Sequence, residues 1–197
     1  MNNKLAPEIL RIFPLTVLKA KIGLEENERN KLINKVYEQR EKSKNFSYKK
    51  KTNAWTGDTQ GFEFLYAEKS FSKLFELISL NIKKYTELIG INNEKIDFYY
   101  QRAWATISKN NENIKPHKHN QSHISFAYYL KKNKSDGNIN FHNDSLQNEI
   151  APAIFKGENE KQQSIFKNNL DNARIITVSP EVDELYVFPS KAAHSTS

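Results

Sequence analysis

The stretch His117–Leu130, which reads HKHNQSHISFAYYL, decides both the fold and the chemistry that we expect. His117 and His119 stand two residues apart, just before an apolar, aromatic-rich run with the composition of a β-strand. In an extended segment the side chains repeat with a period of two, so these imidazoles point to the same side and can bind one metal ion. A polar turn with Gly137 and a second strand pattern follow, which indicates a sheet.

A third candidate ligand lies near the end of the sequence, where ELYVFPSKAAH places His194 just after an apolar strand pattern. In a jelly roll, this strand and the His-x-His strand would bring the three imidazoles to one mouth of the barrel. Three ring nitrogens leave positions open for water, oxygen or a chelating substrate, which favours a catalytic site with Fe(II) as the expected ion. We interpret His123 and His142 as surface residues or as residues behind the ligands.

Composition restricts the class of protein further. A chain of 197 residues is long enough for one domain, and we treat residues 1–197 as a single unit. It has no cysteine, so thiolate sites are excluded and a metal must be bound by His, Asp or Glu. Without a signal-like or membrane-spanning apolar stretch, we expect a cytoplasmic protein. The net charge of +7 comes mainly from scattered lysines, which favours a solvated surface over a nucleic-acid interface.

The order of the predicted elements indicates an α+β fold, mainly β with N-terminal helices. An interrupted edge strand over Ile9–Ile22 precedes two amphipathic helices, Glu25–Lys42 and Ser70–Leu88. Strand patterns follow at Ile96–Ser108, Ser122–Leu130, Asn138–Phe141, Arg174–Val178 and Glu184–Phe188, with Asp144–Asn172 as a long insertion. We therefore expect helical support over about residues 1–95 and a double-stranded β-helix, or jelly roll, over about residues 96–197.

The order of motifs resembles that of the 2-oxoglutarate-Fe(II) oxygenases that are distant relatives of the prolyl hydroxylases. The matching segments read AWATISKNNENIKPHKHNQSHISFAYYL, GNINF and VSPEVDELYVFPSKAAH. Upstream, Ile12, Phe13 and Pro14, then a helix and a loop with Trp55, are similar to the usual opening of that family. The resemblance thus covers nearly the whole chain, and its specificity lies in the order and spacing of the motifs.

The resemblance implies a double-stranded β-helix that holds Fe(II) and uses 2-oxoglutarate and molecular oxygen. His117 matches the first metal ligand, His194 matches the distal ligand, and His119 stands where the wider superfamily has the carboxylate of His-x-Asp. Tyr129 matches a tyrosine that contacts 2-oxoglutarate, and Ser125 lies on the same strand face. The implied activity is that of a dioxygenase, a hydroxylase, with a substrate that the sequence does not name. The surface leaves room for a homodimer.

Several features depart from the pattern of that family. The sequence stops at Ser197, before the strand whose arginine usually clamps the distal carboxylate of 2-oxoglutarate, so we expect a closing strand beyond the sequence given. Phe126 stands where a Ser-Gly pair is usual, and Val182 and Asp183 replace a glycine in the turn before the last strand. Both differences predict an altered local pocket shape. An imidazole at His119 softens the preference for iron, so Zn, Ni or Cu could compete.

Two other classes of protein remain open. A cupin-like metal protein shares the β-helix and would use His123 as a further ligand of the HKHNQSH segment, with chemistry that does not need 2-oxoglutarate. A non-catalytic jelly roll, structural or carbohydrate-binding, needs no metal, and its histidines would be incidental. Alanine at His117 and His194 separates these classes, because only a metal-dependent protein would lose its activity.

Overall fold

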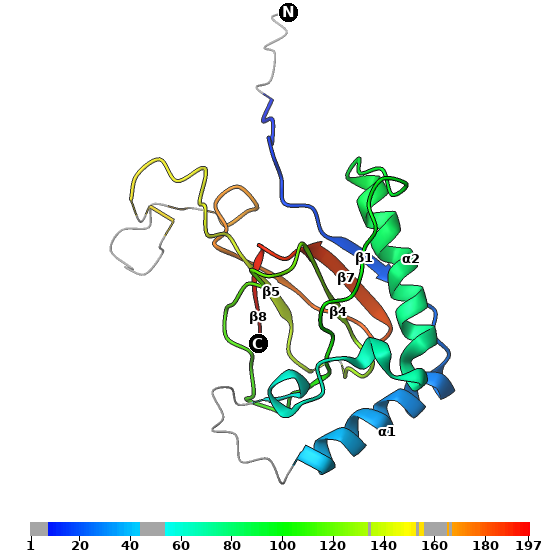
Figure 1. Ribbon diagram of the computed structural model, residues 1–197. Helices are drawn as coiled ribbons and strands as arrows, with labels where there is room; N and C mark the ends of the chain where they lie inside the picture. Colours follow the sequence, from blue (N-terminus) through cyan, green and yellow to red (C-terminus); the bar gives the residue numbers. More distant parts are fainter. Residues whose placement is uncertain (1–7, 44–53, 134, 153, 156–164, 166) are drawn as a thin grey trace, which may run out of the picture.

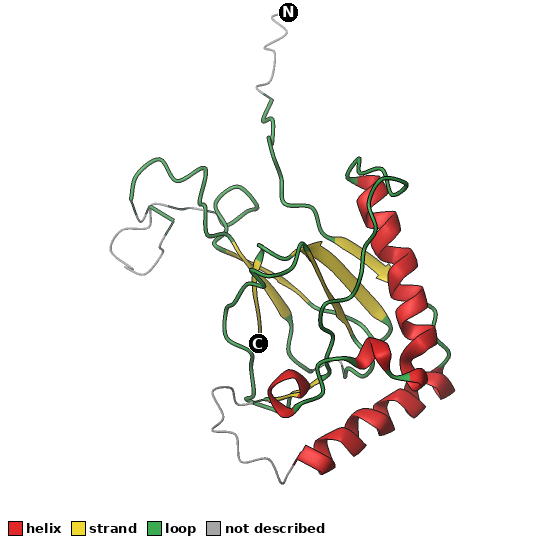
Figure 2. Cartoon of the chain, viewed as in Figure 1, coloured by secondary structure: helices red, strands yellow, loops and turns green. Residues whose placement is uncertain are grey.

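The computed structural model describes residues 8–43, 54–133, 135–152, 154–155, 165 and 167–197. Within these ranges the chain forms two antiparallel three-stranded sheets, with two helices on the outer side of one of them (Figure 1). Long loops join the strands (Figure 2). The fold is therefore mainly β with two helices, which is consistent with the predicted α+β class.

The strands and helices are defined as follows. The first sheet has the order β1 (Leu18–Lys21), β7 (Glu184–Pro189), β4 (Ile124–Tyr128), and the second has the order β6 (Ile175–Val178), β5 (Ile139–His142), β8 (Ala193–Thr196). A short ladder joins β2 (Trp55–Thr56) to β3 (Thr106–Ile107). The helices are α1 (Glu26–Ser43) and α2 (Ser72–Leu88), and the short 3-10 turns are η1 (Gly57–Gln60), η2 (Leu65–Ala67) and η3 (Lys69–Phe71).

Strand β7 links the layers because both of its faces are buried. Leu185 and Val187, each 0% exposed, pack into the core under the helices, whereas Tyr186 and Phe188 pack between the two sheets. A short continuous apolar run is what a strand with two buried faces needs. Each of these side chains contributes about 1.5–3 kcal/mol by leaving water. The strand is thus the common wall of a helix–sheet core and a sheet–sheet core.

The helix–sheet core confirms the helical periodicity in the sequence. The large apolar residues of α2 that are buried fall on one helical face, at separations of three, four and seven: Leu74, Phe75, Ile78 and Tyr85. The ring of Phe126, in β4, lies 6.3 Å from the ring of Phe75 between centroids. The ring of Tyr100, which lies outside the strands, is 5.0 Å from the same ring. Phe126 therefore packs on the helical side of the first sheet and does not face the second sheet.

Two predicted strands are shorter in the structure. Of Ile9–Ile22, only Leu18–Lys21 forms a strand, because Phe13 has a φ of 59° and Pro14 has no N–H to donate to a ladder. Of Ile96–Ser108, only Thr106–Ile107 forms a strand. Just before it, Ala103 pairs instead with residues around Phe64, in an isolated bridge.

The structure also differs from the prediction in the strand that contains His194. His194 was expected just after the strand that is now β7, whereas it lies inside a separate strand, β8, which pairs with β5. Within Asp144–Asn172 the described residues contain no helix or strand, and residues 153, 156–164 and 166 lie outside the described ranges. None of the helices in the described ranges is long and apolar enough to cross a membrane.

The turn before β7 depends on the buried carboxylate of Asp183. This residue has a φ of 69°, a left-handed conformation that favours glycine but that aspartate tolerates. Its carboxylate accepts hydrogen bonds from the backbone N–H groups of Gly23 (2.7 Å) and Leu24 (3.2 Å) and from the hydroxyl of Tyr128 (2.7 Å). The carboxylate thus joins the turn to the connection before α1 and to β4, which explains how a residue other than glycine is accommodated here.

We expect Asp183→Ala to lower the free energy of unfolding by about 2–4 kcal/mol, because three donors lose a charged acceptor. Asp183→Asn is the matched control, since asparagine tolerates the same φ and keeps one acceptor oxygen, and it should cost less. Urea denaturation followed by circular dichroism measures both variants. Equal losses for Ala and Asn would contradict this role of the carboxylate.

Candidate metal centre

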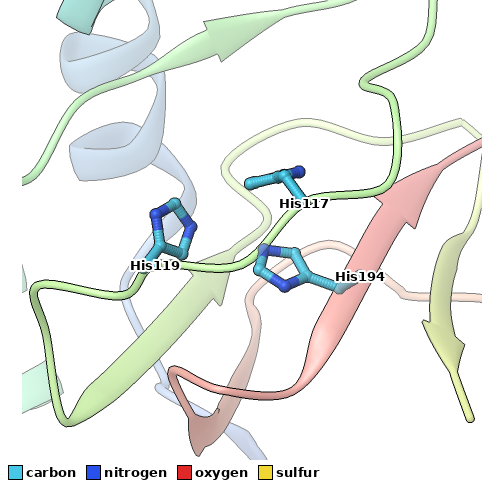
Figure 3. A group of neighbouring side chains, drawn as sticks. All are labelled: His117, His119 and His194. Carbon is cyan, nitrogen blue, oxygen red and sulfur yellow. The ribbon is translucent and has the colours of Figure 1, made fainter. Parts of the chain in front are cut away.

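His117 and His194 lie directly opposite each other in an antiparallel backbone bridge. The N–H of each residue donates to the carbonyl oxygen of the other, both at 3.0 Å. In such a pair the two side chains leave the sheet on the same side. Their imidazole centroids are 4.3 Å apart. Figure 3 shows the two rings next to each other, with His119 nearby. The backbone pairing therefore brings together two histidines that are far apart in the sequence.

His119 completes the cluster from the same segment as His117. Its backbone N–H donates to the carbonyl oxygen of Ser190 at 3.1 Å, in the turn after β7. Its ring centroid lies 4.9 Å from that of His117 and 5.2 Å from that of His194. One possible ligand atom from each of the three residues lies within 4.8 Å of the other two, and the described residues contain no other such group. The structure thus brings all three predicted ligands together.

Backbone carbonyls set the tautomers of two of these rings. Nδ1 of His117 lies 2.9 Å from the carbonyl oxygen of Lys115, and Nδ1 of His194 lies 3.0 Å from that of Ala192. Because a carbonyl oxygen can only accept, Nδ1 of each ring carries a hydrogen, which leaves Nε2 as the nitrogen that can bind a metal. An imidazole whose second nitrogen is held in this way is oriented for metal binding. The residues present therefore fit a divalent metal ion.

Burial keeps two of the imidazoles neutral. It lowers the pKa of His194 to about 4, against the opposing effect of the Ala192 carbonyl, and the neighbouring rings of His117, His119 and His142 lower it further. Burial also lowers the pKa of His119, assisted by His117 and opposed by the carboxylate of Asp58. A neutral imidazole is the form that binds a metal, so these lone pairs are available at neutral pH.

Two aromatic rings pack against the histidine cluster. Trp104 meets the ring of His119 nearly edge-on, at 5.7 Å between centroids, and the guanidinium of Arg102 lies 5.6 Å from the centroid of Trp104. Phe188 meets the ring of His194 at 4.9 Å. An apolar wall limits the access of water to a metal site. We did not predict Trp104 as a site residue, although it belongs to the first segment that carries the family resemblance.

The two residues predicted to bind 2-oxoglutarate lie on the side of the first sheet that faces the second sheet. Ser125 is buried, and its hydroxyl is 2.7 Å from the hydroxyl of Ser190. Tyr129 packs edge-on against Tyr186 with 6.0 Å between centroids, and burial raises its pKa. The Tyr129 hydroxyl has no hydrogen-bond partner among the described residues, so it can receive one from a ligand.

The two remaining histidines stay outside the cluster. His123 contributes its carbonyl oxygen, which accepts the N–H of Ser190 at 3.0 Å. Nε2 of His142 lies 2.9 Å from the hydroxyl of Ser195, on β8. Neither belongs to the group of three in the described part of the chain. The arrangement therefore lends no support to His123 as a ligand, which a cupin-like site would use.

Two packed antiparallel sheets with three convergent imidazoles define a candidate metal-dependent enzyme on a mainly β scaffold. Residues 102–197, which contain all three histidines, match the family model described as "Putative 2OG-Fe(II) oxygenase", where 2OG is 2-oxoglutarate. The match over this segment agrees with the family that the resemblance indicated. The match supports an oxidoreductase whose general chemistry involves iron, oxygen and 2-oxoglutarate. No curated protein matches the chain.

We expect the stability of the metal-free protein to fall as the pH drops from about 6.5 toward 4. The pKa of His194 is about 4 in the folded state but ordinary, about 6.5, in the unfolded chain, so the unfolded state binds more protons in this window. His194→Asn should remove this contribution and flatten the pH dependence. Thermal melts from pH 7 to pH 4 in the presence of a chelator measure it. Parallel curves for wild type and variant would contradict the burial of a neutral His194.

Proposed function

We propose that the protein is an Fe(II)- and 2-oxoglutarate-dependent dioxygenase, a hydroxylase in which His117, His119 and His194 bind the metal ion. The observation that carries this proposal is the convergence of the three imidazoles, with two Nδ1–H groups bonded to backbone carbonyls. The family match over residues 102–197 supports the same general chemistry.

We further propose that the two sheets are the two halves of a double-stranded β-helix in a single domain. Antiparallel sheets packed face to face, with the histidines on strands and loops at one end, support this arrangement. The helices share a core with the first sheet, since Phe71 and Ile78 pack in the same cluster as Leu185 and Val187. This common core supports the assignment of helices and sheets to one folding unit.

Each part of the site has a chemical task. When bound, Fe(II) with 2-oxoglutarate and oxygen supplies the oxidative decarboxylation to succinate and CO₂ that accompanies hydroxylation of a substrate C–H bond. An imidazole that binds a metal brings no negative charge, so three such ligands leave the charge of a divalent cation available to an anionic ligand such as 2-oxoglutarate. Trp104 and Phe188 cover two of the rings and reduce the access of water.

Ser125 and Tyr129 are proposed to contact 2-oxoglutarate from the first sheet. Ser125 is linked through Ser190 to the histidines, because Ser190 bonds to the Ser125 hydroxyl and also accepts the backbone N–H of His119. Tyr129 brings a hydroxyl to the same side of the sheet. Because burial raises its pKa, this hydroxyl stays protonated and can donate to a carboxylate.

The first experiment is an anaerobic titration of the protein with Fe(II) and then with 2-oxoglutarate. We expect Fe(II) to bind and 2-oxoglutarate to produce a visible metal-to-ligand charge-transfer band. In His194→Ala the band should disappear, because one of three ligands is lost. His123→Ala is the matched control: it removes an imidazole from the same region but from outside the cluster, and the band should persist.

The outcomes separate the classes of protein. Iron binding without a band would assign a metal-dependent protein that does not use 2-oxoglutarate. No metal binding in the wild type would contradict the oxygenase proposal and leave a binding module. Loss of the band in His123→Ala would place His123 at the metal and favour a cupin-like site.

Tyr129→Phe tests the proposed contact with 2-oxoglutarate. We expect the Kd of 2-oxoglutarate to rise about 5- to 50-fold, as the loss of one hydrogen bond to a charged group implies, with the Kd of Fe(II) unchanged. The intensity of the same band against 2-oxoglutarate concentration gives the first constant, and competition with a chromophoric chelator gives the second. If both constants stay at the wild-type values, Tyr129 is a core residue only.

A further inference from the structure

One carboxylate oxygen of Asp58, a residue whose charge acts on His119 of the metal centre, lacks a hydrogen-bond partner in the described part of the chain. Its Oδ1 atom is buried and has no hydrogen-bond partner among the residues that the structure describes. A buried carboxylate oxygen without a partner loses its hydration and gains no hydrogen bond in return. We expect such an atom to accept a hydrogen bond from a ligand, from a water molecule or from a neighbouring side chain after a small movement.

The local fold joins the turn that contains Asp58 to the segment that contains Trp104. Asp58 lies in η1, and the N–H of Gly57 at the start of this turn donates to the carbonyl oxygen of Ala105 at 2.9 Å. Ala105 adjoins Trp104, whose ring meets the ring of His119. A Cβ on Gly57 would lie 3.2 Å from the carbonyl oxygen of Phe62, so the absence of a side chain permits this close packing.

The other polar side chains of the turn are already engaged. The hydroxyls of Thr56 and Thr59 lie 3.1 Å apart, and that of Thr59 also donates to the carbonyl oxygen of Thr56 at 3.0 Å. These bonds hold the turn without Asp58. Electrostatically, the carboxylate of Asp58 acts on His119 against the effects of burial and of His117. Oδ1 of Asp58 is therefore available for a role outside its own turn, and His119 is the metal-site imidazole whose pKa its carboxylate raises.

Of the three imidazoles, that of His119 is the one without a hydrogen-bond partner in the described ranges. Nδ1 of His117 and Nδ1 of His194 bond to backbone carbonyls, whereas no side-chain hydrogen bond of His119 occurs among the described residues. A metal-binding imidazole usually donates its second N–H to a carboxylate, a carbonyl or water. One imidazole without an acceptor thus lies near one carboxylate oxygen without a donor.

We propose that Asp58 is a positioning residue of the metal centre, whose carboxylate accepts a hydrogen bond from the N–H of His119, directly or through one water molecule. This inference rests on the proposed function, because it assigns His119 to the metal. The interaction selects the tautomer of His119 and places one negative charge beside three imidazole ligands. A divalent cation in a partly buried site is stabilised by such a charge.

The test measures the affinity of the full chain for Zn(II) and Co(II), with no turnover, by competition with a chromophoric chelator. Asp58→Asn should weaken binding about 10-fold and Asp58→Ala up to about 100-fold, the range for loss of a carboxylate behind a histidine ligand. Asp97→Asn is the matched control, since it makes the same chemical change at an exposed carboxylate and should leave the affinity unchanged. Circular dichroism and thermal melts establish that each variant is folded.

A second readout reports on His119 itself. Long-range ¹H–¹⁵N spectra of the zinc-loaded protein should show one tautomer of His119 in the wild type, and exchange-broadened or shifted ring nitrogens in Asp58→Ala. Unchanged affinity and unchanged His119 signals in both Asp58 variants would overturn this inference, while metal binding that is lost in His194→Ala would leave the proposed function standing. A wild-type chain that binds no metal would overturn both.

Discussion

The backbone bridge between His117 and His194 is the interaction on which the rest of the site depends. It fixes two imidazoles on one side of the second sheet before any metal is present. A slip of one residue in either strand would send one ring to the opposite face, because side chains in strands alternate. The geometry of the site is therefore a property of strand register, and whatever stabilises the register of β8 stabilises the cluster.

The register of β8 is specified from both of its faces. On the inner face, His194 pairs with Phe141 of β5 and contacts Phe188 of β7, so the half-buried ring packs against the core between the sheets. On the outer face, the hydroxyl of Ser195 bonds to His142. A shifted strand would expose the apolar contacts of the inner face and break the polar contact of the outer face. Core packing and site geometry are thus the same constraint in this part of the molecule.

The sequence predicted what depends on local pattern. The amphipathic spacing of α1 and α2, the apolar run of β7 and the His-x-His pair each report a short-range period, and the structure has these elements within one or two residues. The expected jelly-roll topology, together with the family resemblance, supplied the link between His117 and His194. The position of Asp183 in a left-handed turn and the approach of Asp58 to His119 were not predictable, because both arise from contacts between segments far apart in the chain.

A third histidine in place of a carboxylate ligand lowers the cost of desolvation but removes a negative charge from the metal site. A carboxylate ligand brings its own negative charge but must be desolvated, whereas the burial of a neutral imidazole has a lower free-energy cost. Burial lowers the pKa of His194 and of His119 and so secures neutral nitrogens, yet it leaves a bound divalent cation without a counter-charge from its protein ligands. The negative charge must then come from an anionic ligand or from a carboxylate close behind the imidazoles. A site of three histidines is consequently more dependent on its surroundings than one that includes a carboxylate.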